Sequence, residues 1–154
     1  MNIRLLILLL SLLFSVDGYG SFTPADSLLS QAREFTSRSM PDDAIPLLLH
    51  ILESKSSEKE VVWNAKIQLA ETYRQKMERG KGIELLKTML EDKELPPFFR
   101  ASAYNRLAAL FNESENTEIN RTDSALFYSL KCIEIAQTGN FKDLLASSQN
   151  EIAY

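Results

Sequence analysis

A chain of 154 residues, 45% hydrophobic and 25% charged, is long enough for one domain with a buried core, which excludes extended disorder. Its net charge is −4 and its acidic and basic residues are interspersed, so no basic stripe is available for a phosphate backbone and we expect no nucleic-acid partner. Five Gly and five Pro, mostly between apolar segments, favour an all-α fold over a turn-rich β fold.

Residues 1–20 have the order of a secretory signal peptide. Arg4 precedes the apolar run 5–16, and the small residues Gly18 and Gly20 follow it. The run has about 12 residues, whereas a membrane-spanning helix needs about 20. We therefore expect cleavage after Gly18 or Gly20 and export of residues 21–154 to a periplasmic or extracellular space.

The rest of the chain carries apolar residues at helical spacing. Pro41 predicts a helix start, but Pro46 then requires a start nearer Asp43 or a kink. Gly139 and Asn140 are residue types that tolerate a left-handed helix end. The predicted helices lie at about 25–38, 43–54, 58–78, 81–92, 97–112, 122–138 and 141–154.

Several of these helices repeat one another. Segments 44–53, 82–91 and 125–134 align without gaps, each beginning with a small residue and ending in an apolar pair and Glu. The preceding helices match through a small residue and an aromatic one turn later. These pairs are Ala70 with Tyr73, Ala108 with Phe111 and, more loosely, Ala32 with Phe35. The small residue lets a partner helix approach closely, and the aromatic side chain fills the gap that follows. Residues 146–153 repeat 101–108, so a fourth unit has begun.

This pattern resembles the tetratricopeptide repeat family, whose units pair a small residue in each helix with an aromatic residue in the first. The resemblance covers roughly residues 25–154, although the units are spaced by about 38 and 45 residues rather than 34. It implies helix-turn-helix units stacked as a right-handed superhelix. The alternative is a plain antiparallel helical bundle. About three and a half units are expected, at 25–56, 61–95, 97–138 and, as a half unit, 141–154.

Groups that could perform catalysis are scarce. The chain has one His and one Cys, and His50 with Glu53 alone does not make a catalytic metal site. Cys132 falls at a helix-packing position shared with Ile51 and Met89, which predicts a small buried hydrophobe. No glycine-rich phosphate loop is present. We expect no enzymatic activity, no cofactor and no metal.

The family resemblance implies a concave groove, lined by the first helices of successive units, in which a protein or peptide ligand lies. The family's Lys and Asn clamp on a C-terminal carboxylate is not reproduced here, since Asn64 and Asn105 occur without the lysines. The implied groove residues are Arg33, Thr36, Ile67, Glu71, Arg74, Asn105, Ala109 and Asn112.

Two functions remain open at this point. In both, we expect an exported interaction scaffold. In the first, the chain is the sensory N-terminal part of a larger protein, because it resembles the exported sensor regions of bacterial histidine kinases and related regulators of two-component systems. In the other version it is a small self-contained secreted or periplasmic adaptor without signalling output. The final half unit predicts that the chain continues beyond Tyr154, with membrane contact only through such a downstream segment. An uncovered last helix also predicts self-association of the isolated chain.

Overall fold

The protein is all-α throughout the part of the chain that the computed structural model describes, residues 23–54, 58–112 and 121–153. The predicted signal peptide lies outside these residues. The described helices are α2 (Pro24–Ser37), α3 (Pro41–Glu53), α4 (Lys59–Gln75), α5 (Arg79–Leu90), α6 (Pro97–Asn112), α7 (Arg121–Gly139) and α8 (Lys142–Ala153). Their number and approximate positions confirm the helices predicted from sequence.

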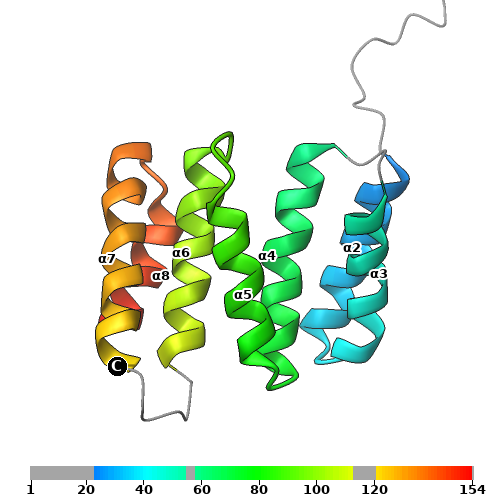
Figure 1. Cartoon of the computed structure of the whole chain (residues 1–154), viewed down its shortest axis with the longest axis horizontal. Helices are drawn as coiled ribbons and strands as arrows, with labels where there is room; N and C mark the ends of the chain where they lie inside the picture. The colour runs from blue at the N-terminus through cyan, green and yellow to red at the C-terminus, as the bar shows by residue number, and fades with distance from the viewer. Residues whose placement is uncertain (1–22, 55–57, 113–120, 154) are drawn as a thin grey trace, which may run out of the picture.

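The helices stand side by side in a row that runs from α2 and α3 at one end to α7 and α8 at the other, each antiparallel to the next in sequence (Figure 1). Every helix packs against its neighbour in sequence. In addition α2 packs against α4, α4 against α6, and α6 against α8, whereas in the described residues no Cα atom of α5 lies within 8 Å of one in α3 or α7. We call α2, α4, α6 and α8 the first helices and α3, α5 and α7 the second helices. The first helices form a continuous layer, and the second helices lie against it.

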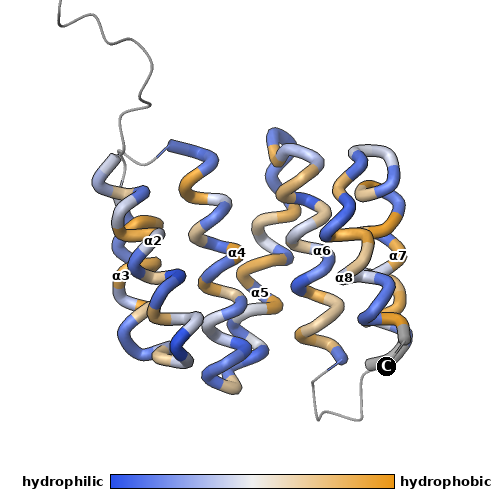
Figure 2. Tube along the Cα trace, turned by 180° about the vertical axis from the view of Figure 1, so that it is seen from behind, coloured by the Kyte–Doolittle hydropathy of each residue, from blue (hydrophilic) through white to orange (hydrophobic). Residues whose placement is uncertain are grey.

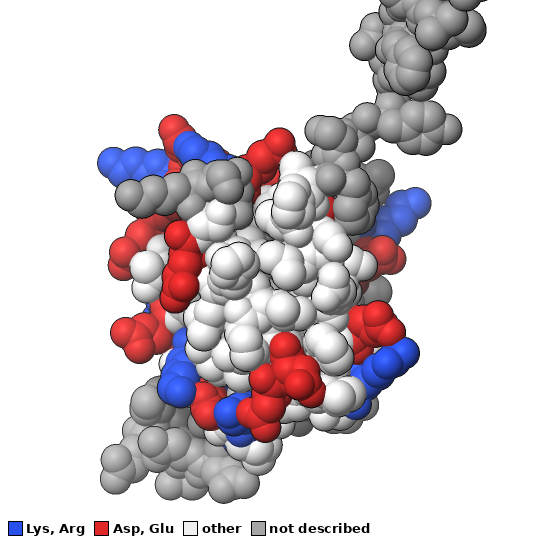
Figure 3. Space-filling view, turned by 90° about the vertical axis from the view of Figure 1, so that its right-hand side faces the viewer, with Lys and Arg blue, Asp and Glu red and all other residues white. Residues whose placement is uncertain are grey.

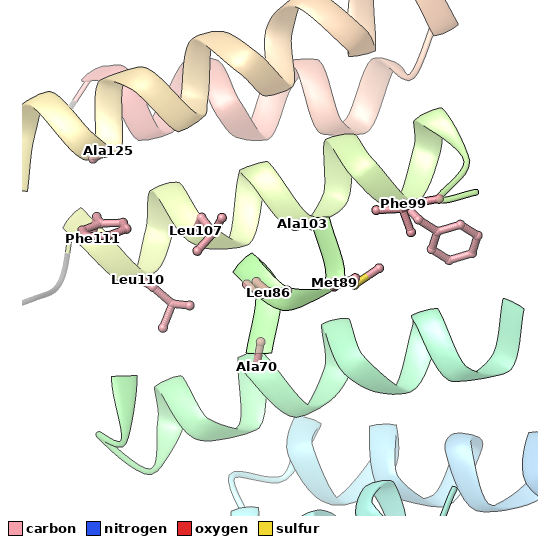
Figure 4. Close-up of a cluster of buried hydrophobic side chains, with 10 residues drawn as sticks. Ala70, Leu86, Met89, Phe99, Ala103, Leu107, Leu110, Phe111 and Ala125 are labelled. Carbon is pink, nitrogen blue, oxygen red and sulfur yellow. The ribbon is translucent and has the colours of Figure 1, made fainter. Parts of the chain in front are cut away.

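Two apolar clusters form the core. One joins α2, α3 and α4, and the other joins α4 to α7, where Leu86 and Met89 of α5 pack against Leu107 of α6 (Figure 4). Leu69 and Ala70, adjacent on α4, belong to different clusters, so this helix is buried on both sides. Hydrophilic and hydrophobic stretches follow one another along the helices (Figure 2). No helix in the described part of the chain is long and apolar enough to cross a membrane.

The small residues that align in the sequence are all buried. A Cβ added to Gly82 would lie 3.2 Å from the Ala70 carbonyl oxygen and 3.2 Å from Leu110 Cδ1, so α5 approaches both α4 and α6 closely. This supports the packing role predicted for small residues at these positions. The six are Ala32, Ala44, Ala70, Gly82, Ala108 and Ala125.

Three helices end in the same left-handed turn, centred on Ser39, Met77 and Asn140, whose φ angles are 56°, 64° and 55°. In each turn the next residue's N–H donates to a carbonyl five positions back, as in Met40 N to Phe35 O at 2.9 Å. The turn at Asn140 fits the predicted cap. The prediction that α4 extends to residue 78 was wrong, because the left-handed Met77 ends the helix at Gln75.

The helix start predicted at Pro41 is confirmed, whereas the alternative start nearer Asp43 is wrong. The helix begins at Pro41 and contains Pro46. The bond that Pro46 cannot donate would have reached the carbonyl of Asp42, which lies on the exposed surface of the first turn. Water can satisfy that carbonyl, so an interior proline costs less here than in the middle of a long helix.

The end of the row formed by α2 and α3 presents an uncharged centre with acidic and basic side chains at its margin (Figure 3). A hollow of about 230 Å³ lies beside the start of α2, lined by residues that include Ala25, Leu28 and His50. Thr23 closes the start of α2 with a capping box: its Oγ1 accepts from Asp26 N at 3.2 Å, and its N–H donates to Asp26 Oδ2 at 3.0 Å. This capping box stabilises the first turn of α2.

Candidate functional site

Polar contacts run across the first helices from one to the next. Between α2 and α4, Arg33 Nη2 donates to Asn64 Oδ1 at 3.1 Å. The hydroxyls of Thr36 and Thr72 share a buried hydrogen bond of 3.1 Å between the same helices. Hydrogen bonds require defined distances and angles, so these contacts set how the two helices lie relative to each other.

A charge cluster joins α4 to α6. Arg74 donates to both carboxylate oxygens of Glu71, from Nε to Oε2 at 3.0 Å and from Nη2 to Oε1 at 2.6 Å. Arg106 of α6 adds a third bond, from Nη1 to Oε2 at 3.2 Å. The Glu71 side chain is 13% exposed, while those of Arg74 and Arg106 are 27% and 41% exposed. One carboxylate thus holds two guanidinium groups, and the cluster keeps a net positive charge on its outer side.

The ionisation of Glu71 reflects this arrangement. Burial by itself raises the pKa of Glu71, but the hydrogen bond from Arg74 and the positive charges of Arg106 and Arg74 outweigh burial and hold the pKa below its usual value. Glu71 is therefore ionised at neutral pH and keeps both arginines in place.

The contacts between α6 and α8 are also polar. Asn105 Nδ2 donates to Ser148 Oγ at 2.9 Å, and Ser147 Oγ donates to Asn105 Oδ1 at 3.2 Å. Asn112 Nδ2 donates to the carbonyl oxygen of Glu151 at 2.9 Å and to its Oε2 at 2.7 Å. The last described helix is therefore attached to the row on the same side as α2 and α4.

The residues predicted for the groove separate into two groups. Thr36, Asn105 and Ala109 are buried, and the first two connect neighbouring helices. The other five keep some exposure on α2, α4 and α6: Arg33, Ile67, Glu71, Arg74 and Asn112. We call the exposed and half-buried side chains that the first helices present together the first-helix surface.

Sequence reasoning missed Arg106, which lies on the first-helix surface and bonds Glu71 across α4 and α6. Its neighbour Asn105 was singled out, and a helix turns by about 100° per residue, so the two side chains leave α6 in different directions. Asn105 faces α8 and Arg106 faces α4. The sequence pattern of α6 alone does not indicate on which side of it α4 and α8 pack.

Groups typical of catalysis do not gather in the described residues. Cys132 is buried, as its repeat position predicts, and burial raises the pKa of its thiol. His50 is exposed on α3. Within the ranges the structure describes, no three His, Cys, Asp or Glu side chains are grouped so as to hold a metal ion.

Two hollows lie near the second helices. One of about 320 Å³ separates α3 from α5 and is lined mainly by apolar side chains, including Leu49, Leu69 and Leu85. Another, of about 500 Å³, lies where the start of α6 meets the end of α7. At its edge Arg100 donates to the carbonyl oxygens of Leu90 and Asp92, at 3.0 and 2.9 Å, and so closes the end of α5.

The geometry thus defines a helical protein whose distinctive polar surface runs across successive first helices. Comparison with known proteins adds no assignment, since no family model, no curated protein and no solved structure matches this chain.

Proposed function

We propose that this chain is an exported scaffold of stacked tetratricopeptide-like helix pairs that binds a protein or peptide ligand along its first-helix surface. The burial of all six aligned small residues supports the helix pairing. The contacts between successive first helices, without matching contacts between the described second helices, support curvature toward the first-helix side. Such curvature produces the concave surface of a repeat array, and a right-handed superhelix is what the family resemblance implies for it.

The observation that carries the proposal is the set of arginines on the first-helix surface. Arg33, Arg74 and Arg106 come from three successive first helices, and each has a polar partner that positions it. Side chains that are already positioned lose little conformational entropy when a ligand binds. Three guanidinium groups on one surface favour a ligand that presents carboxylates or backbone carbonyls to them.

The predicted signal peptide at residues 1–20 supports a role outside the cytoplasm. Arg4, the apolar run and the small residues after it support export to a periplasmic or extracellular space. We favour a sensory N-terminal part of a bacterial signalling protein, in which ligand binding is passed to a downstream segment. A self-contained secreted or periplasmic adaptor is the second candidate. N-terminal sequencing by mass spectrometry tests whether residues 1–20 are a signal peptide removed on export: cleavage near residue 20 supports this, and an intact Met1 on exported protein contradicts it.

A peptide-display library selected on the purified chain tests the binding surface. We expect selected peptides to bind roughly tenfold more weakly to an Arg33→Ala, Arg74→Ala double variant. Arg38→Ala is the matched control, because Arg38, the residue that caps the end of α2, is also exposed but pairs with Glu34 one turn earlier. Binding that survives the double variant, and is instead lost when an exposed second-helix residue such as Lys87 is changed, contradicts the proposal.

A further inference from the structure

The second helix α7 presents larger apolar side chains to solvent than the second helix α5 does. Leu126, Phe127 and Leu130 are 41%, 53% and 53% exposed. At the aligned positions α5 carries the half-buried Ile83 and the exposed, charged Glu84 and Lys87. Contiguous large apolar side chains on a surface mark an interaction site more often than isolated ones do. We call Leu126, Phe127 and Leu130 the α7 apolar patch.

The patch is continuous with aromatic side chains packed beneath it. The ring centroids of Phe127 and Tyr128 lie 5.2 Å apart in an edge-to-face arrangement. The Tyr128 ring stacks on those of Tyr104 and Phe111 of α6, with centroids 6.0 and 5.5 Å apart. The Tyr128 ring is therefore fixed in place by its contacts with α6. Only α6 and α8 pack against α7 among the described helices, so the outward side of α7 has no covering helix there (Figure 1).

Acidic side chains stand at both ends of the patch. Asp123, Phe127, Leu130 and Glu134 follow one another at four, three and four residues, so they form one line along α7 about 16 Å long. Asp123 is exposed, and the Glu134 side chain is 69% exposed. Lys131, 3.2 Å from Glu134, lies beside this line rather than on it.

This charge pattern distinguishes between a second copy of the chain and a different protein as the partner that covers the α7 apolar patch. In a symmetric pair of copies joined through α7, antiparallel helices place Asp123 opposite Glu134 of the other copy, and parallel helices place each acid opposite itself. Like charges then meet at both ends of the contact, which disfavours a second copy. A helix with an apolar stripe and a basic residue near each end is complementary to the apolar patch and to the acid at each end of it.

We propose that the α7 apolar patch is a docking site for an amphipathic helix of a partner protein, with basic residues flanking its apolar stripe. The partner's apolar side chains cover Phe127 and Leu130, and its basic residues pair with Asp123 and Glu134. This contact is separate from the first-helix surface, so the chain holds two ligands at once, one on each layer.

Fluorescence anisotropy with two synthetic helices of about 14 residues tests the proposal. One helix has an apolar stripe with lysines near both ends, and the other has glutamates in place of the lysines. We expect the lysine helix to bind the chain, and the glutamate helix to bind roughly tenfold more weakly. A double variant, Asp123→Lys with Glu134→Lys, should reverse that preference.

Phe127→Glu separates this contact from general attraction between a basic peptide and an acidic protein. The substitution adds negative charge, so unspecific attraction would strengthen, whereas loss of the apolar contact weakens binding of the lysine helix roughly tenfold. Lys87→Glu, at the aligned outward position of α5, is the control and should not weaken binding. Circular dichroism establishes that each variant is folded. If Phe127→Glu does not fold, Leu130→Gln, which adds no charge, replaces it in the same measurement.

Two outcomes overturn the proposal. In one, folded Phe127→Glu binds the lysine helix as tightly as the unaltered chain. In the other, sedimentation shows that the unaltered chain dimerises and that Phe127→Glu makes it monomeric, in which case a second copy covers the patch.

Discussion

The first helices of this protein are joined to one another by polar contacts in addition to apolar packing, whereas the second helices are held mainly by apolar packing. Thr36 with Thr72, Glu71 with Arg106, and Asn105 with Ser148 connect successive first helices by directed polar contacts. The second helices are anchored through buried residues such as Leu48, Leu86 and Cys132. Burial of apolar surface is strong but has no direction, whereas hydrogen bonds are weaker in net terms but fix geometry. We therefore expect changes in the second helices to cost more stability, and changes in the first helices to alter the binding surface.

The largest expected effect tests the apolar anchoring of a second helix. Leu86 is fully buried in the cluster around α5 and α6 (Figure 4), so Leu86→Ala leaves a cavity and should lower the free energy of unfolding by about 2–5 kcal/mol. Urea denaturation followed by circular dichroism measures this. The exposed neighbour Lys87→Ala should change stability by less than about 0.5 kcal/mol. Equal effects at the two positions would contradict the packing described for α5.

A pair of glycines on one helix sharpens the same test. Gly82 is in close contact with α4 and α6, so Gly82→Leu should destabilise by about 1–3 kcal/mol or more through overpacking. Gly80, two residues earlier, has open space around its Cβ position, and Gly80→Ala should stabilise by up to about 1 kcal/mol through helix propensity. Thermal unfolding of both variants measures the difference in sign. Stability unchanged by Gly82→Leu would mean that α5 does not approach its neighbours closely.

The next prediction concerns the charge cluster of the first helices. Glu71→Gln leaves Arg74 and Arg106 without their shared carboxylate and should cost about 1–3 kcal/mol at pH 7. The pKa of Glu71 is lowered in the folded state, so the unfolded chain takes up the proton first as pH falls. The stabilisation is complete above the unfolded-state pKa of about 4.3 and is lost as pH falls through the lower folded-state pKa.

The unfolding free energies of the unaltered chain and Glu71→Gln should therefore converge in acid. Urea titrations at several pH values measure the difference in unfolding free energy between the two proteins. The other carboxyl groups contribute equally to both proteins, so their effect cancels in this difference. A difference that stays constant from pH 7 down to pH 3 or so would show that the charge of Glu71 is not what stabilises the contact.

The smallest expected effect lies in the buried hydrogen bond between α2 and α4. Thr72→Val removes one hydroxyl and leaves that of Thr36 with its bond to the Ala32 carbonyl, so the cost should be about 1 kcal/mol or less. The double variant with Thr36→Val should cost less than the sum of the two single variants, because both lose the same bond. A double-mutant cycle measures this coupling. Strict additivity would show that the two hydroxyls do not interact.

Much of the helical framework was accessible from sequence because it depends on local features. Apolar spacing located seven helices, and matching small residues identified the positions where helices approach, as at Ala44, Gly82 and Ala125. The same alignment predicted the burial of Cys132. The end of α4 escaped prediction because Met77, unlike Gly or Asn, has no intrinsic preference for a left-handed backbone. Its conformation depends on the bonds made by the surrounding turn.

The sequence by itself determined that this protein is helical and where its helices and small packing residues lie, because helical periodicity and residue size act over a few neighbouring positions. Only the tertiary structure decided which groove residues remain exposed, placing Thr36 and Asn105 in buried contacts and bringing Arg106 to Glu71. It also showed that α7 leaves Phe127 and Leu130 uncovered. These outcomes depend on which distant helix packs beside each face, and a pattern within one helix does not contain that information.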